Sequence, residues 1–244
     1  MSSPKAPERL AQRTAVVTGA SRGIGFEIAR LLIAEGARVV LVARDKRALD
    51  DAARTLGEMA TAVGCDVSQP KALEAARSRI RSLLGAAPDI LVNNAGAFTL
   101  ATIETVDPSE FAAAIDTNLN GPLRLVRGFL AEMRARGAGH VITIGSVADR
   151  YIFPENAAYA ASKHAARALH EVLRLETRGT GVRATLVSPG PVDTPLWNTV
   201  DPDNRPGFTP RAAMLSATAV AEAVIYAVTQ PNEVNIDELR LSRS

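Results

Sequence analysis

We predict a doubly wound α/β fold, in which helices cover both faces of a seven-stranded parallel sheet. Three observations lead to this prediction: short apolar runs alternate with longer helical patterns, the runs are apolar throughout, and a glycine-rich turn follows the first of them. Continuous apolar runs are typical of strands that are covered on both faces, as in parallel sheets. Strands and helices in alternation then give an arrangement of the Rossmann type.

Each predicted strand is a short apolar run with helical sequence on either side. The strands are expected at residues 14–18, 38–43, 59–64, 90–93, 140–145, 182–188 and 234–239. In such folds ligands bind beyond the carboxyl ends of the strands. The functional residues are therefore expected directly after each strand.

Two helices between these strands have recognisable starts. Asp107 is expected to be an N-cap, with Pro108 at the first helical position and Glu110 three residues after the cap. Ser68 is expected to cap the start of an earlier helix. The apolar face of that earlier helix would contain Leu73, Ile80 and Leu84.

The composition indicates a soluble globular protein with one domain. The chain has 244 residues, of which 47% are hydrophobic and 22% charged, a balance that allows a sizeable core. No linker, charge block or internal repeat divides it. We expect a flexible arm at residues 1–12 and a single nucleotide-binding domain at 13–244.

Charge and cysteine content exclude several other classes of protein. A formal charge of +2 with dispersed arginines does not indicate nucleic-acid binding. The single cysteine, Cys65, has no disulfide partner, and His140, His164 and His170 are too dispersed for a zinc site, so no metal is expected. Neither a signal peptide nor a membrane span is evident, and the expected location is the cytoplasm.

The turn after the first strand, "TGASRGIG", predicts a dinucleotide site. Gly19, Gly23 and Gly25 precede a helix whose N-terminal N–H groups would face a pyrophosphate. The spacing G-x-x-x-G-x-G differs from the general G-x-G-x-x-G fingerprint, but its position between a strand and a helix is the one that the fingerprint requires. An ordinary tight turn is the alternative interpretation.

Two arginines favour NADP over NAD as the cofactor. Arg44 directly follows the second strand, and Arg22 in the glycine turn can reach the same side. Guanidinium groups suit bidentate contact with a 2'-phosphate. In the alternative, Asp45 binds the ribose and Arg44 is a solvated surface charge, although Asp45 is more simply the N-cap of the next helix.

The segment "YAASK" places Tyr159 and Lys163 on one face of a predicted helix. A nearby ammonium and a cationic nicotinamide would stabilise the tyrosine phenolate, so that Tyr159 exchanges a proton with a reacting oxygen at neutral pH. Ser146, just after the fifth strand, would orient that oxygen. Taken alone, the pair is more typical of a core tyrosine and a solvated lysine. The glycine turn and Ser146, thirteen residues upstream of Tyr159, favour the catalytic interpretation.

Together these motifs resemble the short-chain dehydrogenase/reductase superfamily over almost the whole chain after the N-terminal arm. "TGASRGIG" is similar to its cofactor turn, "CDV" (65–67) to its adenine segment, "NNAG" (93–96) to its fourth-strand motif, and "SPGPVDT" (188–194) to its nicotinamide segment. The resemblance implies a catalytic tetrad of Asn118, Ser146, Tyr159 and Lys163. Its implied cofactor contacts are Gly19, Ser21, Arg22, Gly23, Ile24, Gly25, Arg44, Asp66, Val67, Asn93, Ala95, Gly96, Tyr159, Lys163, Pro189, Gly190, Val192 and Thr194.

By the same resemblance, Asn118 would hold a water that connects Lys163 with bulk solvent. From the residues alone, Asn120 is an equal candidate, because either asparagine can bond locally within a helix. The resemblance also implies a homotetramer or a dimer. "VNIDEL" near the carboxyl terminus is similar to the branch containing NADP-dependent dehydrogenases of serine and other 3-hydroxy acids.

Two loops are expected near the substrate. Residues 195–210 are rich in turn-forming residues and are predicted to be a lid that brings Trp197 and Phe208 over the substrate, or else an ordinary surface loop. Arg150, between Ser146 and Tyr159, is a candidate for binding a carboxylate or phosphate of the substrate, or faces solvent.

The sequence therefore predicts an NADP(H)-dependent oxidoreductase that acts on a carbonyl or secondary alcohol, with Tyr159 as general acid and base. A protein that binds NADPH without turnover, as a sensor or scaffold, is the alternative from another class. An epimerase or dehydratase that recycles the cofactor is the alternative among enzymes. The substrate is a small molecule whose identity depends on loops.

Overall fold

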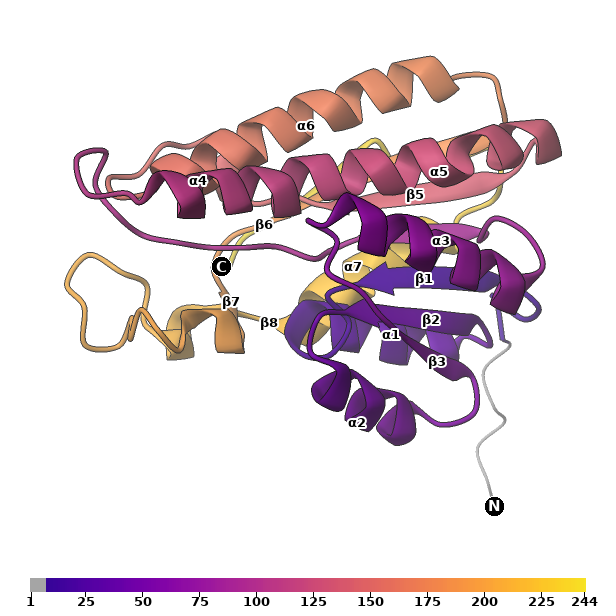
Figure 1. The fold of residues 1–244 in the computed structure, drawn as a ribbon, viewed down its shortest axis with the longest axis horizontal. Helices are drawn as coiled ribbons and strands as arrows, with labels where there is room; N and C mark the ends of the chain where they lie inside the picture. The colour runs from indigo at the N-terminus through magenta and orange to yellow at the C-terminus, as the bar shows by residue number, and fades with distance from the viewer. Residues whose placement is uncertain (1–7) are drawn as a thin grey trace.

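The computed structural model describes residues 8–244, and it confirms the predicted α/β fold (Figure 1). Seven parallel strands form one sheet in the order β3-β2-β1-β4-β5-β6-β9. Their bounds are β1 (Thr14–Thr18), β2 (Arg38–Ala43), β3 (Ala60–Gly64), β4 (Ile90–Asn93), β5 (Gly139–Ile144), β6 (Val182–Pro189) and β9 (Glu238–Leu241). Two short strands, β7 (Val192–Asp193) and β8 (Leu215–Ser216), pair separately.

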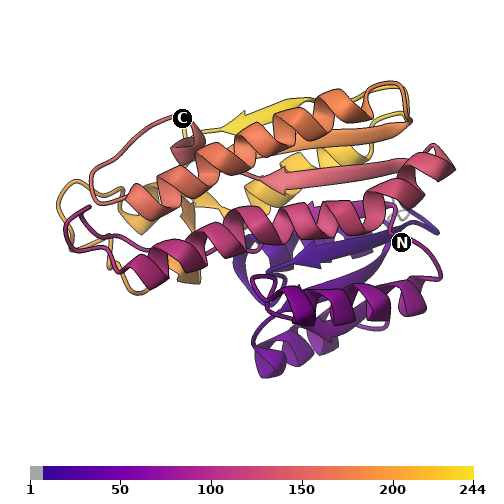
Figure 2. The same ribbon diagram turned by 45° about the horizontal axis from the view of Figure 1, so that its top comes forward.

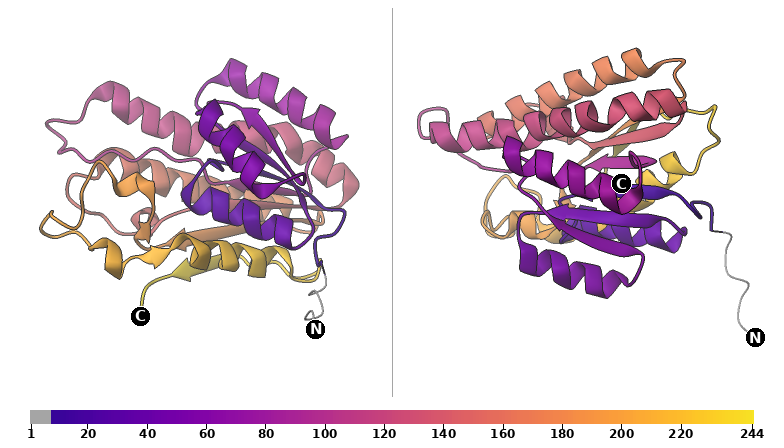
Figure 3. Two further views of the ribbon diagram at one scale, coloured as in Figure 1. Left: turned by 90° about the horizontal axis from the view of Figure 1, so that it is seen from below. Right: turned by 45° about the vertical axis from the view of Figure 1, so that its right-hand side comes forward.

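Helices cover both faces of this sheet (Figures 1 and 3). The first face carries α1 (Gly23–Ala34), α2 (Lys46–Leu56) and α7 (Ala217–Val228). The second carries α3 (Pro70–Leu84), α5 (Gly121–Arg136) and α6 (Ala157–Thr177). The helix α4 (Pro108–Ile115) continues into α5 through a π-helical turn, Asp116–Asn120, and Figure 2 shows this continuous rod lying beside α6.

The apolar runs of the strands supply both cores. Because successive side chains of a strand point to opposite faces, Val17 and Leu41 pack under α1 and α2, whereas Val16 and Val40 pack under α3 and α5. All four side chains are 1% exposed or less. The buried strands hold the sheet rigid, so that the loops at its carboxyl edge start from fixed positions.

The helix starts agree with the prediction at Asp45 and Asp107 and differ at Ser68. The Asp45 carboxylate accepts a hydrogen bond from Ala48 N at 3.0 Å, and the Asp107 carboxylate accepts one from Ser109 N at 2.7 Å. The prediction for Ser68 is wrong. Its N–H and hydroxyl both donate to Asp66, and α3 begins after Gln69 without a side-chain cap.

The last strand begins four residues later than the predicted 234–239 segment. The Asn235 side chain accepts a hydrogen bond from Ala184 N and donates one to Ala184 O, at 2.9 and 3.1 Å. The amide side chain thus takes the place of a strand backbone beside β6. Backbone pairing of β9 with β6 then starts at Glu238.

The first residues of the chain pack against the domain from Glu8 onward, whereas a flexible arm was expected at 1–12. Leu10 is only 4% exposed, and its N–H donates to Glu35 O at 2.8 Å. Arg9 forms an ion pair with Glu35. Residues 1–7 of the expected arm lie outside the described residues. No helix within residues 8–244 is long and apolar enough to cross a membrane.

Candidate active site

A cleft of about 950 Å³ lies at the carboxyl edge of the sheet. Residues that follow β1, β2, β3, β4, β5 and β6 line it, as expected for this fold. The sheet order places β1 and β4 side by side at its centre, where the chain reverses its direction of winding. The cleft therefore has an end beside β2 and β3 and an end beside β5 and β6. We call these the cofactor end and the substrate end.

The glycine turn at the centre has no room for side chains. Gly19 has φ +66°, and a Cβ atom there would lie 2.9 Å from Ala95 Cα. A Cβ atom on Gly25 would lie 2.4 Å from the Gly19 carbonyl oxygen, so Gly25 is required for packing and does not itself line the cleft. Arg22, the N-cap of α1, makes no capping bond, which leaves the first N–H groups of α1 directed at the cleft.

Asn94 fixes this turn and was not predicted from the sequence. Its Nδ2 donates to Thr18 O at 2.8 Å and to Gly19 O at 3.3 Å, which joins the ends of β1 and β4. Asn93, which was expected to contact the cofactor, is 4% exposed, does not line the cleft and has no side-chain hydrogen bond. The "NNAG" motif contains both residues, and strand alternation turns their side chains to opposite sides.

The cofactor end holds two cations without partners. Arg22 and Arg44 are exposed and line the cleft, and neither guanidinium forms a hydrogen bond or an ion pair with the described residues. Asp45 also lines the cleft, but its carboxylate caps α2. Unpaired guanidiniums beside a glycine turn and a free helix N-terminus fit a dinucleotide with an additional phosphate.

The residues after β3 form the far wall of the cofactor end. Asp66 accepts two hydrogen bonds from Ser68, at 2.9 and 2.7 Å, which shapes the turn beside Val67. Burial raises the pKa of Cys65 to about 11, with a smaller contribution from the charge of Asp66. The thiol is therefore protonated at neutral pH and is not a nucleophile. Within residues 8–244, no group of three His, Cys, Asp or Glu side chains is placed to hold a metal ion.

Tyr159, Lys163 and Ser146 meet at the substrate end. Tyr159 and Lys163 lie one turn apart on α6, and Lys163 Nζ is 5.6 Å from the centre of the Tyr159 ring. Lys163 Nζ also donates to Ile144 O at 2.8 Å, so the end of β5 fixes its position. Ser146 Oγ accepts a hydrogen bond from Ala148 N at 3.1 Å, and its hydroxyl also interacts with Tyr159.

Burial shifts the pKa values of Tyr159 and Lys163. Burial raises the pKa of Tyr159 above its ordinary value, and hydrogen bonding with Ser146 opposes this only in part. Burial also lowers the pKa of Lys163 to about 8. Tyr159 therefore keeps its proton at neutral pH in the chain alone. The predicted stabilisation of its phenolate includes a cationic nicotinamide as well as the lysine, and it stays a prediction.

A buried carboxylate, Asp149, completes the group and was also not predicted. It is 0% exposed, and its Oδ2 accepts hydrogen bonds from Ser188 Oγ at 2.5 Å and from Ser146 N at 3.3 Å. Its charge raises the pKa values of both Lys163 and Tyr159. The sequence held no signal for Asp149, because an aspartate in the first turn of a short helix is normally exposed.

Asn118 lies in the π-helical turn between α4 and α5 and packs against α6. Its side chain accepts a bond from Ala97 N at 2.8 Å and donates to Ala97 O and Ser162 Oγ at 2.9 and 2.8 Å. Asn120 bonds only to Asp116 within the same turn, at 2.8 Å. Of the two asparagines, Asn118 is therefore the one connected with the helix that carries Tyr159 and Lys163. Such π turns are frequent at functional sites.

Most of the residues that were expected at the cofactor line one continuous cleft. The exceptions are Gly25 and Asn93. The residues that line it are Gly19, Ser21, Arg22, Gly23, Ile24, Arg44, Asp66, Val67, Ala95, Gly96, Tyr159, Lys163, Pro189, Gly190, Val192 and Thr194.

The loop at 195–210 lies beside the substrate end, past the carboxyl ends of the strands (Figure 1). Trp197 contacts Phe98, with ring centres 5.2 Å apart, and Phe98 contacts Tyr159 at 4.9 Å. Phe208 lies 6.3 Å from Trp197. The loop therefore extends an aromatic wall outward from Tyr159, whereas its role as a lid stays a prediction.

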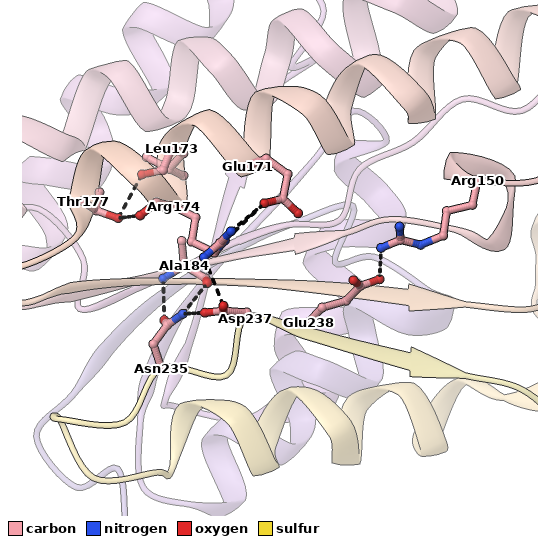
Figure 4. A network of polar contacts seen from close by, with 9 residues as sticks. All are labelled: Arg150, Glu171, Leu173, Arg174, Thr177, Ala184, Asn235, Asp237 and Glu238. Atoms are coloured by element: carbon pink, nitrogen blue, oxygen red, sulfur yellow. Dashed lines mark hydrogen bonds and ion pairs between the residues drawn. The ribbon is translucent and has the colours of Figure 1, made fainter.

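Arg150 does not line the cleft, so the suggested grip on a substrate anion is wrong. It forms an ion pair with Glu238 on β9 (Figure 4). Its Nε also lies 3.7 Å from an oxygen of Asp149. Figure 4 also shows Arg174 of α6 held between Glu171 and Asp237. These contacts fasten α6 and the Ser146 loop to the edge strand β9.

Comparison with known proteins agrees with this geometry. A family model described as short chain dehydrogenase matches residues 13–205. An uncharacterized oxidoreductase of Staphylococcus epidermidis is 34% identical over 96% of this chain and 98% of its own length. A metagenomic short-chain oxidoreductase, solved in complex with NADP, superimposes with a TM-score of 0.83 at 34% identity, covering 97% of this chain and 99% of its own. The closed form of a serine dehydrogenase complexed with NADP⁺ has a TM-score of 0.86 at 31% identity, covering 93% of each chain. The chain belongs to the short-chain dehydrogenase family of oxidoreductases.

Proposed function

We propose that the protein is an NADP(H)-dependent oxidoreductase that moves a hydride between nicotinamide and a carbonyl or secondary alcohol. The observation that carries the proposal is one cleft that holds two unpaired arginines at one end and Tyr159, Lys163 and Ser146 at the other. Two solved structures similar to this chain are described as complexes with NADP or NADP⁺, which supports the choice of cofactor.

Ser146, Tyr159 and Lys163 would each have a separate role in the reaction. The bound nicotinamide supplies or accepts the hydride. The Ser146 hydroxyl would donate a hydrogen bond to the substrate oxygen, which orients the carbonyl beside Tyr159. Because burial raises its pKa, Tyr159 would hold its proton until the oxygen becomes basic during reduction. Lys163 would then restore the proton, and its pKa of about 8 suits exchange near neutral pH.

Two tyrosine variants test the proposal. Tyr159→Phe should lower the kcat of NADPH oxidation by about 10²- to 10⁴-fold, the usual contribution of a general acid, while the Kd for NADPH stays unchanged. Tyr226→Phe is the matched control, because Tyr226 is 54% exposed and lies outside the cleft. Each variant is assayed with a panel of candidate substrates: ketones and 3-oxoacyl thioesters in the direction of reduction, and 3-hydroxy acids in the direction of oxidation. NADPH binding without turnover of any of them would favour a sensor.

We also propose an assembly of two or four copies. Leu123 of α5 and Val172 and Leu175 of α6 expose 43%, 51% and 56% of their surface, on helices that lie side by side. Exposed apolar side chains on neighbouring helices favour association. Light scattering that gives the mass of one chain at micromolar concentration would contradict an assembly.

A further inference from the structure

The wall of the substrate end is aromatic. Tyr159, Phe98, Trp197 and Phe208 follow one another with ring centres 4.9, 5.2 and 6.3 Å apart, each pair in an edge-to-face orientation. The Trp197 indole N–H donates to Val192 O at 3.0 Å, so its polar atom is already bonded. The wall thus offers a ligand ring faces and edges, with no free polar atom on the indole.

Every arginine that we find near this wall has an acidic partner. Arg205 forms an ion pair with Glu155 and stacks on Phe208, with 4.7 Å from its guanidinium carbon to the ring centre. Arg211 pairs with Asp193 at 2.7 Å. Lys163 is bonded to Ile144 O beneath the tyrosine. Among the described residues that line the cleft, the unpaired arginines are Arg22 and Arg44 alone.

Both arginines start from strands other than the one that precedes Ser146: Arg22 follows β1, two strand intervals or about 10 Å from β5, and Arg44 lies further away. Arg44 follows β2 and Ser146 follows β5, and three strand intervals separate β2 from β5 in the sheet. At about 4.8 Å for each interval the separation is roughly 14 Å. A carboxylate on the substrate would therefore meet the Glu155 carboxylate and apolar rings without a free cation, and transfer of such a charge out of water is costly.

We propose that the substrate is an uncharged ketone, or the matching secondary alcohol, with an aromatic or bulky apolar substituent. This inference rests on the proposed function and specifies its substrate class. The carbonyl would lie at Ser146 and Tyr159, and the substituent would lie against Phe98 and Trp197. The proposal separates this protein from the 3-hydroxy acid dehydrogenases that "VNIDEL" resembles and from the serine dehydrogenase of similar fold.

Three 3-oxo compounds test charge and ring separately. Ethyl benzoylacetate is neutral and carries a phenyl ring, benzoylacetate has the same skeleton with a carboxylate, and ethyl acetoacetate has a methyl group in place of the ring. The neutral phenyl ester should exceed ethyl acetoacetate in kcat/KM by about tenfold or more, because its ring is buried against the wall. It should exceed benzoylacetate by a similar factor, because the carboxylate would leave water without meeting a free cation. A kcat/KM for benzoylacetate equal to or above that of its ester would overturn the proposal.

Substitution of Trp197 tests whether the aromatic wall causes the preference for the phenyl substrate. Trp197→Ala should reduce the phenyl-to-methyl ratio of kcat/KM by about tenfold and leave the ester-to-acid ratio unchanged, whereas Tyr226→Ala should alter neither. Binding is measured independently in the NADPH complex of Tyr159→Phe, by competition among the three compounds for quenching of Trp197 fluorescence. Preferred binding of the neutral phenyl ester there supports the substrate class even without turnover. Turnover that favours benzoylacetate and requires Tyr159 would contradict the proposed substrate class but would still support the reductase function.

Discussion

The two ends of the cleft recognise their ligands by different means. The cofactor end presents backbone N–H groups, glycines without room for a Cβ atom and two arginines without partners. The substrate end presents aromatic side chains from α6 and two loops, and the arginines around it are paired. A polar, charged ligand is thus expected at one end and an uncharged, apolar one at the other. The difference follows from the groups that each end leaves without a partner: N–H donors and positive charge at the cofactor end, and aromatic surface at the substrate end.

The largest expected effect comes from removing the charge of the cofactor end. In Arg22→Ala/Arg44→Ala, the Kd for NADP⁺ should rise by about 10²-fold or more, because hydrogen bonds to charged groups contribute about 1.5–3 kcal/mol each. The Kd for NAD⁺, which lacks the 2'-phosphate, should change by less than about threefold. Isothermal titration calorimetry measures both constants.

Arg47→Ala is the matched control for this pair, since Arg47 is exposed nearby on α2 and does not line the cleft. Equal losses of NADP⁺ and NAD⁺ affinity in the double variant would show that the arginines do not bind the 2'-phosphate.

A smaller effect is expected from giving the substrate end a free cation. Glu155→Gln leaves Arg205 without its ionic partner beside the aromatic wall. The ratio of kcat/KM for benzoylacetate to that for its ethyl ester should rise about fivefold, the range of a partly exposed ion pair. The double variant Glu155→Gln/Arg205→Gln removes both charges and should bring the ratio back to that of the unmodified protein. A rise that persists in the double variant would exclude Arg205 as its cause.

The smallest effect concerns the carboxylate beneath the substrate end. Asp149 raises the pKa values of Tyr159 and Lys163, so Asp149→Asn should lower both. In alcohol oxidation, which needs the phenolate, the rising limb of the kcat–pH profile should move to lower pH. At a fixed pH the rate should change only about threefold, since a shift of about half a pKa unit changes the amount of the reactive form by that factor.

Ser188→Ala removes the hydrogen bond to the same carboxylate but keeps its charge, and its profile should stay in place. An unmoved profile in Asp149→Asn as well would mean that Asp149 only fixes the position of the Ser146 loop.

The strands, the helix starts and the glycine turn were predictable from the sequence, because local backbone conformation decides them. Val16, Val40 and their neighbours mark strands by continuous apolar character, and Asp45 and Asp107 mark helix starts by local hydrogen bonds. The glycine turn was predictable because only glycine fits the contacts of Gly19 and Gly25. These features are decided within a few residues of chain.

The features that sequence reasoning missed depend on contacts between distant segments. Asn235 displaced the start of β9 by bonding with Ala184. Ser68 is the local exception, because it donates to Asp66 two residues away and does not cap α3. Arg150 could not be assigned until Glu238 was brought beside it. Asp149 likewise matters only because β6 places Ser188 against it. Side-chain partners of this kind are set by the folded sheet and leave no periodic pattern in the sequence.

Trp197 gives the protein an optical probe of its own chemistry. It is the single tryptophan of the chain, and it lines the same cleft as the residues that surround the nicotinamide in our proposal. Indole emission overlaps the absorption of a reduced nicotinamide but not that of an oxidised one, so energy transfer would distinguish the two redox states. A stopped-flow trace of this one fluorophore could therefore follow a single catalytic cycle without any label.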